Sequence, residues 1–142
     1  MKKNSLFIIM GLLLLISIAF NISLNNSVKE VDIAFVSKLD SLNSSLKFFN
    51  ENTNLQSKIR NSSSQSGSVL ALYKLTSYFN KNKSLFGTLN ELNLAFINLP
   101  EDKLLKNISK ISDYIVKIRN NPEDVNISDE FNQFIFEIGA SE

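Results

Sequence analysis

The chain has 142 residues, of which 15 are basic and 14 acidic, and it contains neither cysteine nor histidine. Without cysteine there is no disulfide framework and no thiolate chemistry, and without histidine the commonest general base and transition-metal ligand is missing. Because basic and acidic residues are nearly equal in number, the sequence gives no sign of the basic surface that nucleic-acid binding requires, and no nucleic-acid partner is expected.

An uncharged and almost wholly apolar stretch lies near the N-terminus, at residues 6–24. As a helix this stretch would be about 28 Å long, close to the thickness of the hydrocarbon core of a bilayer. Two lysines precede it, so the positive-inside rule places residues 1–5 in the cytoplasm and the rest of the chain outside. The sequence therefore predicts a single transmembrane anchor in the inner (cytoplasmic) membrane, with a domain in the periplasm or outside the cell.

A cleaved signal peptide is the alternative interpretation of the same stretch. The small residues of Ser17-Ile18-Ala19 would form the cleavage site, and the mature chain would begin at Phe20. No proline or glycine stands directly before this site, in residues 12–16, and apolar residues continue to Leu24, which favours an uncleaved anchor. In both interpretations the same domain is exported from the cytoplasm.

A long membrane-proximal helix is predicted over residues 25–60. Ser27 and Glu30 have the spacing of a capping box, which would start a new helix or mark a break in the membrane helix. Apolar residues then recur every three or four positions, close to a heptad pattern, although further apolar side chains widen the stripe and favour packing in a bundle. The residues of this stripe are Val28, Val31, Phe35, Leu39, Leu42, Leu46 and Phe49.

Residues 61–68 contain five serines and no apolar side chain, so they are predicted to form a flexible loop. A helical bundle is predicted over residues 69–142. Its first part, up to Leu99, would hold one long helix or two shorter ones, because Gly87 costs about 1 kcal/mol of helix stability relative to alanine.

Two further helices are predicted near the C-terminus, each opened by a proline that acidic residues follow. The first starts at Leu99-Pro100-Glu101-Asp102 and ends at Asn120-Asn121, and the second starts at Asn121-Pro122-Glu123-Asp124. Alternation over residues 134–138 leaves a short strand as the minor alternative there. The predicted fold class is therefore all-α, with a single transmembrane helix followed by an exported bundle of about four helices, the first long and heptad-like.

Three acidic pairs are the candidates for catalytic or metal-binding carboxylates. They are Glu101-Asp102, Glu123-Asp124 and Asp129-Glu130, and all lie near predicted helix starts, where the helix dipole favours negative charge. Helix capping explains them, so no catalytic residue, cofactor or metal is expected. Residues 103–119 hold five bases and one acid, whereas residues 120–142 hold six acids and no base. The acidic segment is therefore expected to fold back on the basic helix, and a surface that meets a charged partner is the alternative.

The exposed apolar side chains are expected to contact a partner. The first exported helix is longer than the later ones, so its membrane-proximal part, from Val28 to about Phe35, is predicted to stay uncovered and to pair with another helix. Two phenylalanines, Phe48 and Phe136, also fit the core stripes poorly: packing in a wider core stripe is the favoured interpretation for each, and an exposed interface patch is the alternative. The candidate partner-binding residues are Val28, Val31, Phe35, Leu39, Phe48 and Phe136.

The expected function is that of a non-enzymatic, bitopic structural or accessory subunit of an envelope-spanning assembly for motility, secretion or the cell envelope. Its partners would be the membrane, through residues 6–24, and other envelope proteins or a second copy of the chain. The alternative is a cleaved, soluble helical binding module in the periplasm or outside the cell.

Overall fold

The computed structural model describes residues 2–50 and 54–140, and the side chains of residues 10–49 and 54–140. Five α-helices and one 3-10 turn form in these ranges, and no strand occurs in them, which confirms the all-α prediction. The elements are α1 (Lys2–Lys47), η1 (Phe48–Asn50), α2 (Leu55–Tyr73), α3 (Ser84–Asn98), α4 (Glu101–Asn120) and α5 (Val125–Ala140).

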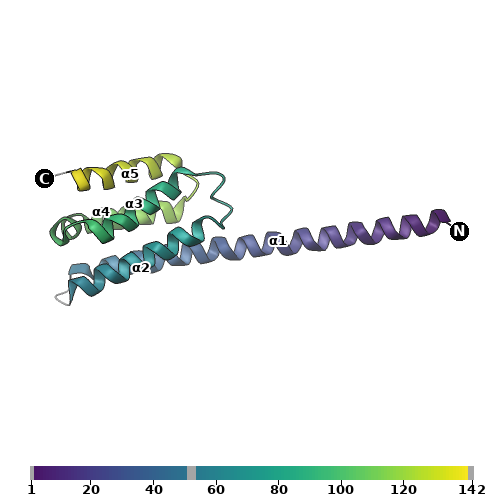
Figure 1. Cartoon of the computed structure of the whole chain (residues 1–142), viewed down its shortest axis with the longest axis horizontal. Coiled ribbons are helices and arrows are strands. Elements are labelled where there is room, and N and C mark those ends of the chain that lie inside the picture. Colours follow the sequence, from purple (N-terminus) through teal and green to yellow (C-terminus); the bar gives the residue numbers. More distant parts are fainter. Residues whose placement is uncertain (1, 51–53, 141–142) are drawn as a thin grey trace.

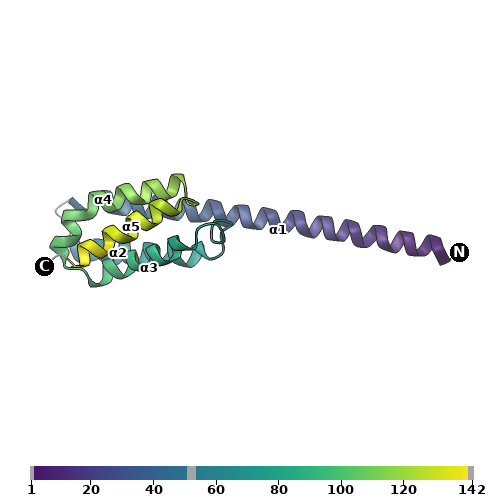
Figure 2. The same cartoon turned by 90° about the horizontal axis from the view of Figure 1, so that it is seen from above.

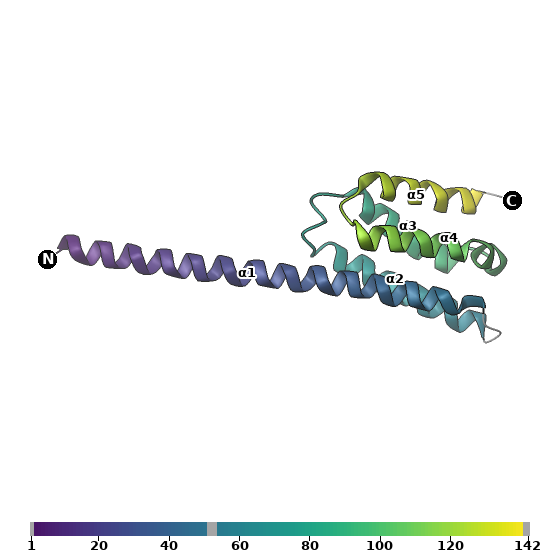
Figure 3. The same cartoon turned by 180° about the vertical axis from the view of Figure 1, so that it is seen from behind.

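The N-terminal half of α1 projects alone, whereas its C-terminal half packs with the other helices (Figures 1 and 3). We call the packed residues, 31–49 and 54–140, the helical body. Within it, α1 lies between α2 and α4, α2 contacts α3, and α5 lies between α3 and α4. The five helices therefore surround a common core (Figure 2). The α3 and α5 helices run in the same direction, because a reversed helix, α4, separates them in the chain (Figure 1).

Each helix contributes an apolar stripe to this core. On α4 the stripe follows the 3- and 4-residue spacing that the sequence shows, and its members are at most 5% exposed: Leu104, Ile108, Ile111, Ile115 and Ile118. The helix begins at Glu101, directly after Pro100, and ends at Asn120, so its predicted boundaries are confirmed. Fully burying one such side chain contributes about 1.5–3 kcal/mol, so these helices are stabilised mainly by packing.

In the N-terminal half of α1, the side chains that the structure describes, from Met10 to Leu24, bury nothing. From Met10 to Leu24 every side chain is exposed, and α1 is the one helix of the described chain that is long and apolar enough to cross a membrane. The helix continues without a break into the helical body. The predicted capping box is therefore wrong: Ser27 lies inside the helix, and its hydroxyl donates a hydrogen bond to the carbonyl of Ser23, four residues earlier, at 3.1 Å.

The prediction of a loop at residues 61–68 is also wrong, because these residues form the middle of α2. Ser62 and Ser66 are buried, where their small side chains allow close packing against α1 and α3. The Ser62 hydroxyl lies 3.0 Å from the hydroxyl of Ser45, and Ser66 donates to Asn93 at 2.7 Å. These contacts between helices outweigh the low helix propensity of the serine run.

The first exported helix does not reach residue 60 as predicted. It ends at Lys47, a 3-10 turn follows, and Asn54 caps the start of α2 by accepting a hydrogen bond from the Ser57 amide at 3.3 Å. The C-terminal segment is helical rather than a strand. Asp124 caps α5, because its carboxylate accepts from the backbone amides of Asn126 and Ile127.

Candidate functional site

On α1, the membrane-proximal part of the apolar stripe is covered by other helices from Phe35 onward, closer to the N-terminus of α1 than the sequence predicts. Val28 and Val31 are partly exposed, but Phe35 and Leu39 have no exposed surface. The Phe35 ring lies 5.3 Å from the ring of Tyr73, measured between centroids, because the end of α2 and the segment after it lie over this part of α1. The prediction that Phe35 and Leu39 bind a partner is therefore wrong, since both belong to the core of their own chain.

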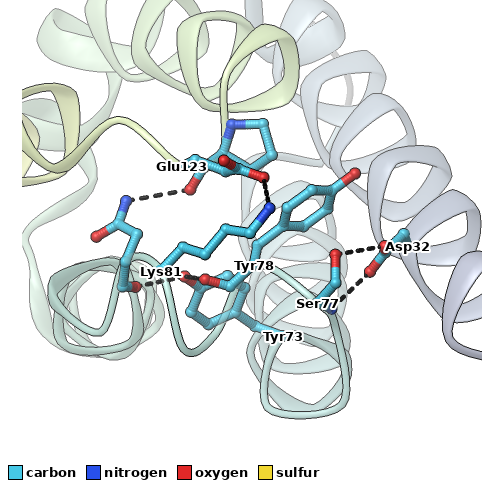
Figure 4. Close-up of polar contacts among 8 residues, drawn as sticks. Asp32, Tyr73, Ser77, Tyr78, Lys81 and Glu123 are labelled. Carbon is cyan, nitrogen blue, oxygen red and sulfur yellow. Dashed lines mark hydrogen bonds and ion pairs between the residues drawn. The ribbon is translucent and has the colours of Figure 1, made fainter.

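A pair of hydrogen bonds joins the α2–α3 connection to α1 just before Phe35. The Asp32 carboxylate accepts from the backbone amide of Ser77 at 2.8 Å and from the Ser77 hydroxyl at 2.7 Å (Figure 4). Asp32 is eight residues beyond Leu24, about 12 Å along the helix. The contact thus fixes the end of the helical body at a short, defined distance from the exposed apolar half of α1.

Two connections meet at this end of the body: residues 74–83 and residues 121–124 (Figures 1 and 3). Asn82 is 1% exposed, and its side-chain nitrogen donates to the carbonyls of Pro122 and Asp124, each at 3.1 Å. At the surface, the Lys81 ammonium pairs with the Glu123 carboxylate at 2.5 Å (Figure 4). We call Asp32 and these two connections the junction.

Tyr73 is buried beneath the junction and donates a hydrogen bond from its hydroxyl to the carbonyl of Asn82. Burial disfavours the phenolate and raises the pKa of Tyr73 from 10.0 to about 12. The junction therefore depends on a protonated tyrosine.

The acidic C-terminal helix, α5, packs on the basic helix, α4. Two lysines of α4 lie over aromatic rings. The Lys110 ammonium lies 4.1 Å from the centre of the Phe134 ring, and Lys117 lies 4.9 Å from that of Tyr114. Tyr114 stacks on Phe131 with 4.8 Å between ring centroids. The Lys110 contact joins α4 to α5, as expected for a segment that folds back, whereas the Lys117 contact lies within α4.

The two phenylalanines that fit the core poorly are exposed, so the favoured interpretation of a wider core stripe is wrong for both. Phe48 is 54% exposed in η1, directly after α1, and Phe136 is 75% exposed on α5. They lie on separate elements, and Phe136 borders a groove that has a volume of about 1020 Å³ and lies between α3 and α5. We call this the docking groove. It is defined by Glu91, Leu94 and Ala95 from α3 and by Asp129, Phe136 and Gly139 from α5.

Most residues of these two regions had no signal in the sequence. Asp32 and Ser77 are 45 residues apart, and Glu91 and Asp129 lie on helices that a third helix separates. Only Phe136 could be singled out, because it falls outside the apolar stripe of its helix. The three acidic pairs have structural neighbours: Glu101 and Asp102 begin α4, Glu123 pairs with Lys81, Asp124 caps α5, and Asp129 accepts from Ser84.

The fold and these two regions define a helical protein with one candidate membrane-spanning helix, a fixed junction beside it and an open groove on the far part of the body. Among the residues that the structure describes, no three acidic side chains gather to form a metal site. The chain matches no protein-family model, no curated protein and no solved structure.

Proposed function

We propose that the protein is a non-enzymatic, single-pass protein of the inner membrane that holds its helical body outside the cytoplasm. In this position it serves as a structural or accessory subunit of an envelope-spanning assembly, such as a motility, secretion or cell-envelope machine. The continuity of α1 is the observation that supports this function. One uninterrupted helix carries an exposed apolar half and then a half that is built into the core.

The exposed half is apolar on every side, which suits lipid rather than a protein core or water. Leu13 is 62% exposed, Leu14 65% and Phe20 70%. Cleavage before Phe20, the alternative origin of the domain, would fall inside the helix and would leave Phe20, Ile22 and Leu24 exposed on a helix that projects from the body. We therefore prefer an uncleaved anchor to a soluble binding module.

The support for a non-enzymatic role comes from the use of the acidic residues. Of those that could have formed a carboxylate site, Asp124 caps a helix, and Glu123 and Asp129 bind neighbouring side chains. No histidine or cysteine is present in the chain. The exposed groove offers a contact surface instead.

Two measurements on the protein from its native membrane test this function. The intact mass should correspond to the uncleaved chain, and purification in mild detergent should yield a stoichiometric protein partner. A mature N-terminus at Phe20 would instead establish the soluble module, and recovery of the uncleaved chain alone would contradict a role as a subunit.

A further inference from the structure

The docking groove is formed by the one pair of packed helices that run in the same direction. Hydrogen bonds tie their first turns together, from Thr88 to the carbonyl of Ser128 at 2.9 Å and from Ser84 to Asp129. The groove then follows α5 from Asp129 to Ala140, about 16 Å of helix or three turns. Its far end lies at the end of the body that is remote from the projecting half of α1 (Figure 1), so a bilayer around that half does not reach it.

The groove is lined mainly by apolar and small residues, with three uncharged polar side chains, Asn98, Asn132 and Gln133, among them. Phe136, on α5, is 75% exposed and Leu94, on α3, is 39% exposed, while Ala95 and Gly139 are small lining residues of the same two helices. A β-carbon built at Gly139 meets no atom within 4 Å, so there is open space above the backbone. A mainly apolar lining about three turns long that includes small residues matches grooves that accept the apolar face of a helix.

The negative charges around the groove favour an occupant that carries positive charge over one that does not. Glu91 and Asp129 line it, no basic residue does so among the described ones, and neither acid belongs to an ion pair there. If two copies of the chain joined groove to groove, neither groove would offer a basic residue to pair with these acids, which is unfavourable. Lysine or arginine beside them would complement the charge.

We propose that the docking groove binds one amphipathic helix of a partner protein, about three turns long. Its apolar residues insert between Leu94 and Phe136, and its lysine or arginine residues lie beside Glu91 and Asp129. The inference rests on the proposed function, because it specifies the chemistry of the partner that the subunit contacts.

A designed peptide tests the groove directly. The probe is a fluorescein-labelled 14-residue helical peptide with leucines at 3- and 4-residue spacing and lysines on the flanks, and the target is the full chain in phosphatidylcholine nanodiscs. We expect saturable binding, measured as fluorescence anisotropy above that of empty nanodiscs. Binding should weaken at least tenfold in Gly139→Trp, which fills the groove, and severalfold in Glu91→Gln/Asp129→Asn, with a smaller dependence on salt.

Matched controls distinguish binding in the groove from non-specific binding of the peptide. Gly87 also has open space at its β-carbon but does not line the groove, so Gly87→Trp should bind the peptide as the unaltered chain does. A peptide with glutamate in place of lysine should bind at least tenfold more weakly. No saturable binding, equal binding of both peptides, or unchanged binding by Gly139→Trp would overturn the inference. Dimerisation of the chain that Gly139→Trp abolishes would show that a second copy occupies the groove.

Failure of the groove and failure of the proposed function give different results in the native membrane. A photo-crosslinking residue in place of Phe136 should trap the stoichiometric partner, whereas one at Leu105, on α4, should not. A partner that copurifies but crosslinks only at Leu105 would leave the proposed function intact and disprove the groove. The absence of any partner would contradict the function itself.

Discussion

The two halves of α1 consist of similar apolar residues but have opposite surroundings. Between Met10 and Leu24 apolar side chains point in all directions, and none is buried. From Phe35 to Leu46 they form one stripe, in which Phe35, Leu39, Leu42 and Leu46 are at most 2% exposed, and polar residues occupy most of the other positions. Apolar character around a whole helix requires an apolar solvent, whereas a one-sided stripe requires only other helices. The change occurs within about ten residues of a single, unbroken helix.

The largest expected effect comes from a charge placed in the second half. Phe35→Glu would bury a carboxylate without a partner among Tyr73 and its neighbours and should lower the free energy of unfolding by more than about 4 kcal/mol. Chemical denaturation followed by circular dichroism measures this loss. Ile33→Glu, two residues earlier, is the control, because Ile33 is 69% exposed and its replacement should change stability by less than about 0.5 kcal/mol. Equal effects at the two positions would mean that α1 does not pack as described.

A charge placed in the first half of α1 should impair membrane insertion and leave the stability of the helical body unchanged. Leu14→Arg should disfavour membrane insertion by about 2.5–3.5 kcal/mol, because arginine at the centre of a membrane helix is costly. Alkaline carbonate extraction should move the variant from the membrane pellet to the supernatant, while the helical body stays resistant to protease. If Leu14→Arg remains in the pellet as the unaltered chain does, the first half is not the anchor.

A substitution in the junction should have an intermediate effect on the free energy of unfolding. Asp32→Ala removes both acceptors of Ser77 and should cost about 1–2 kcal/mol of stability. Hydrogen exchange should increase first in residues 74–83. Asp40→Ala is the matched control on the same helix, because Asp40 pairs with Arg119 at the surface and the loss should be below about 1 kcal/mol. A larger effect at Asp40 would show that the Asp32 contact does not fix the body on α1.

The smallest effect is a loss of stability in alkaline solution. The pKa of Tyr73 is raised from 10.0 to about 12 in the folded chain, so the folded state binds the proton more tightly and stability falls as the pH rises from 10 to 12. The loss should be about 1 kcal/mol at pH 11, since one pKa unit corresponds to 1.36 kcal/mol. Thermal unfolding between pH 9 and pH 11 should show a shallower decline in Tyr73→Phe. An equal decline would assign the titration to other groups.

The elements that the sequence predicts well are those whose own residues specify them. The α4 helix has Pro100 before it, acids in its first turn and a strict apolar stripe, so its ends and buried face could be read directly. The place of Phe136 outside the α5 stripe marks it as a candidate for exposure, although the sequence favours a wider core stripe, and Phe136 is 75% exposed. Periodicity and capping are local, and here no distant contact changes their outcome.

The errors arise where distant contacts decide the structure. The serines of α2 have low helix propensity, but Ser62 and Ser66 meet Ser45 and Asn93 from two other helices, and the segment is helical. Phe35 was expected to be exposed because the later helices are short, yet the end of α2 lies over it. The docking groove belongs to two helices that are not consecutive in the chain, so its shape has no signature in sequence spacing.

A scan of single cysteines along α1 tests most directly whether one helix passes from lipid into the core. The chain has no cysteine of its own, so each introduced cysteine can carry a spin label, and its exposure to oxygen and to a water-soluble nickel complex can be measured in nanodiscs. We expect preferential oxygen exposure at every position from 10 to 24, nickel exposure near residues 26–30, and protection every three or four residues from 35 to 46. Nickel exposure throughout residues 10–24, or protection there on one face only, would contradict a lipid-embedded first half.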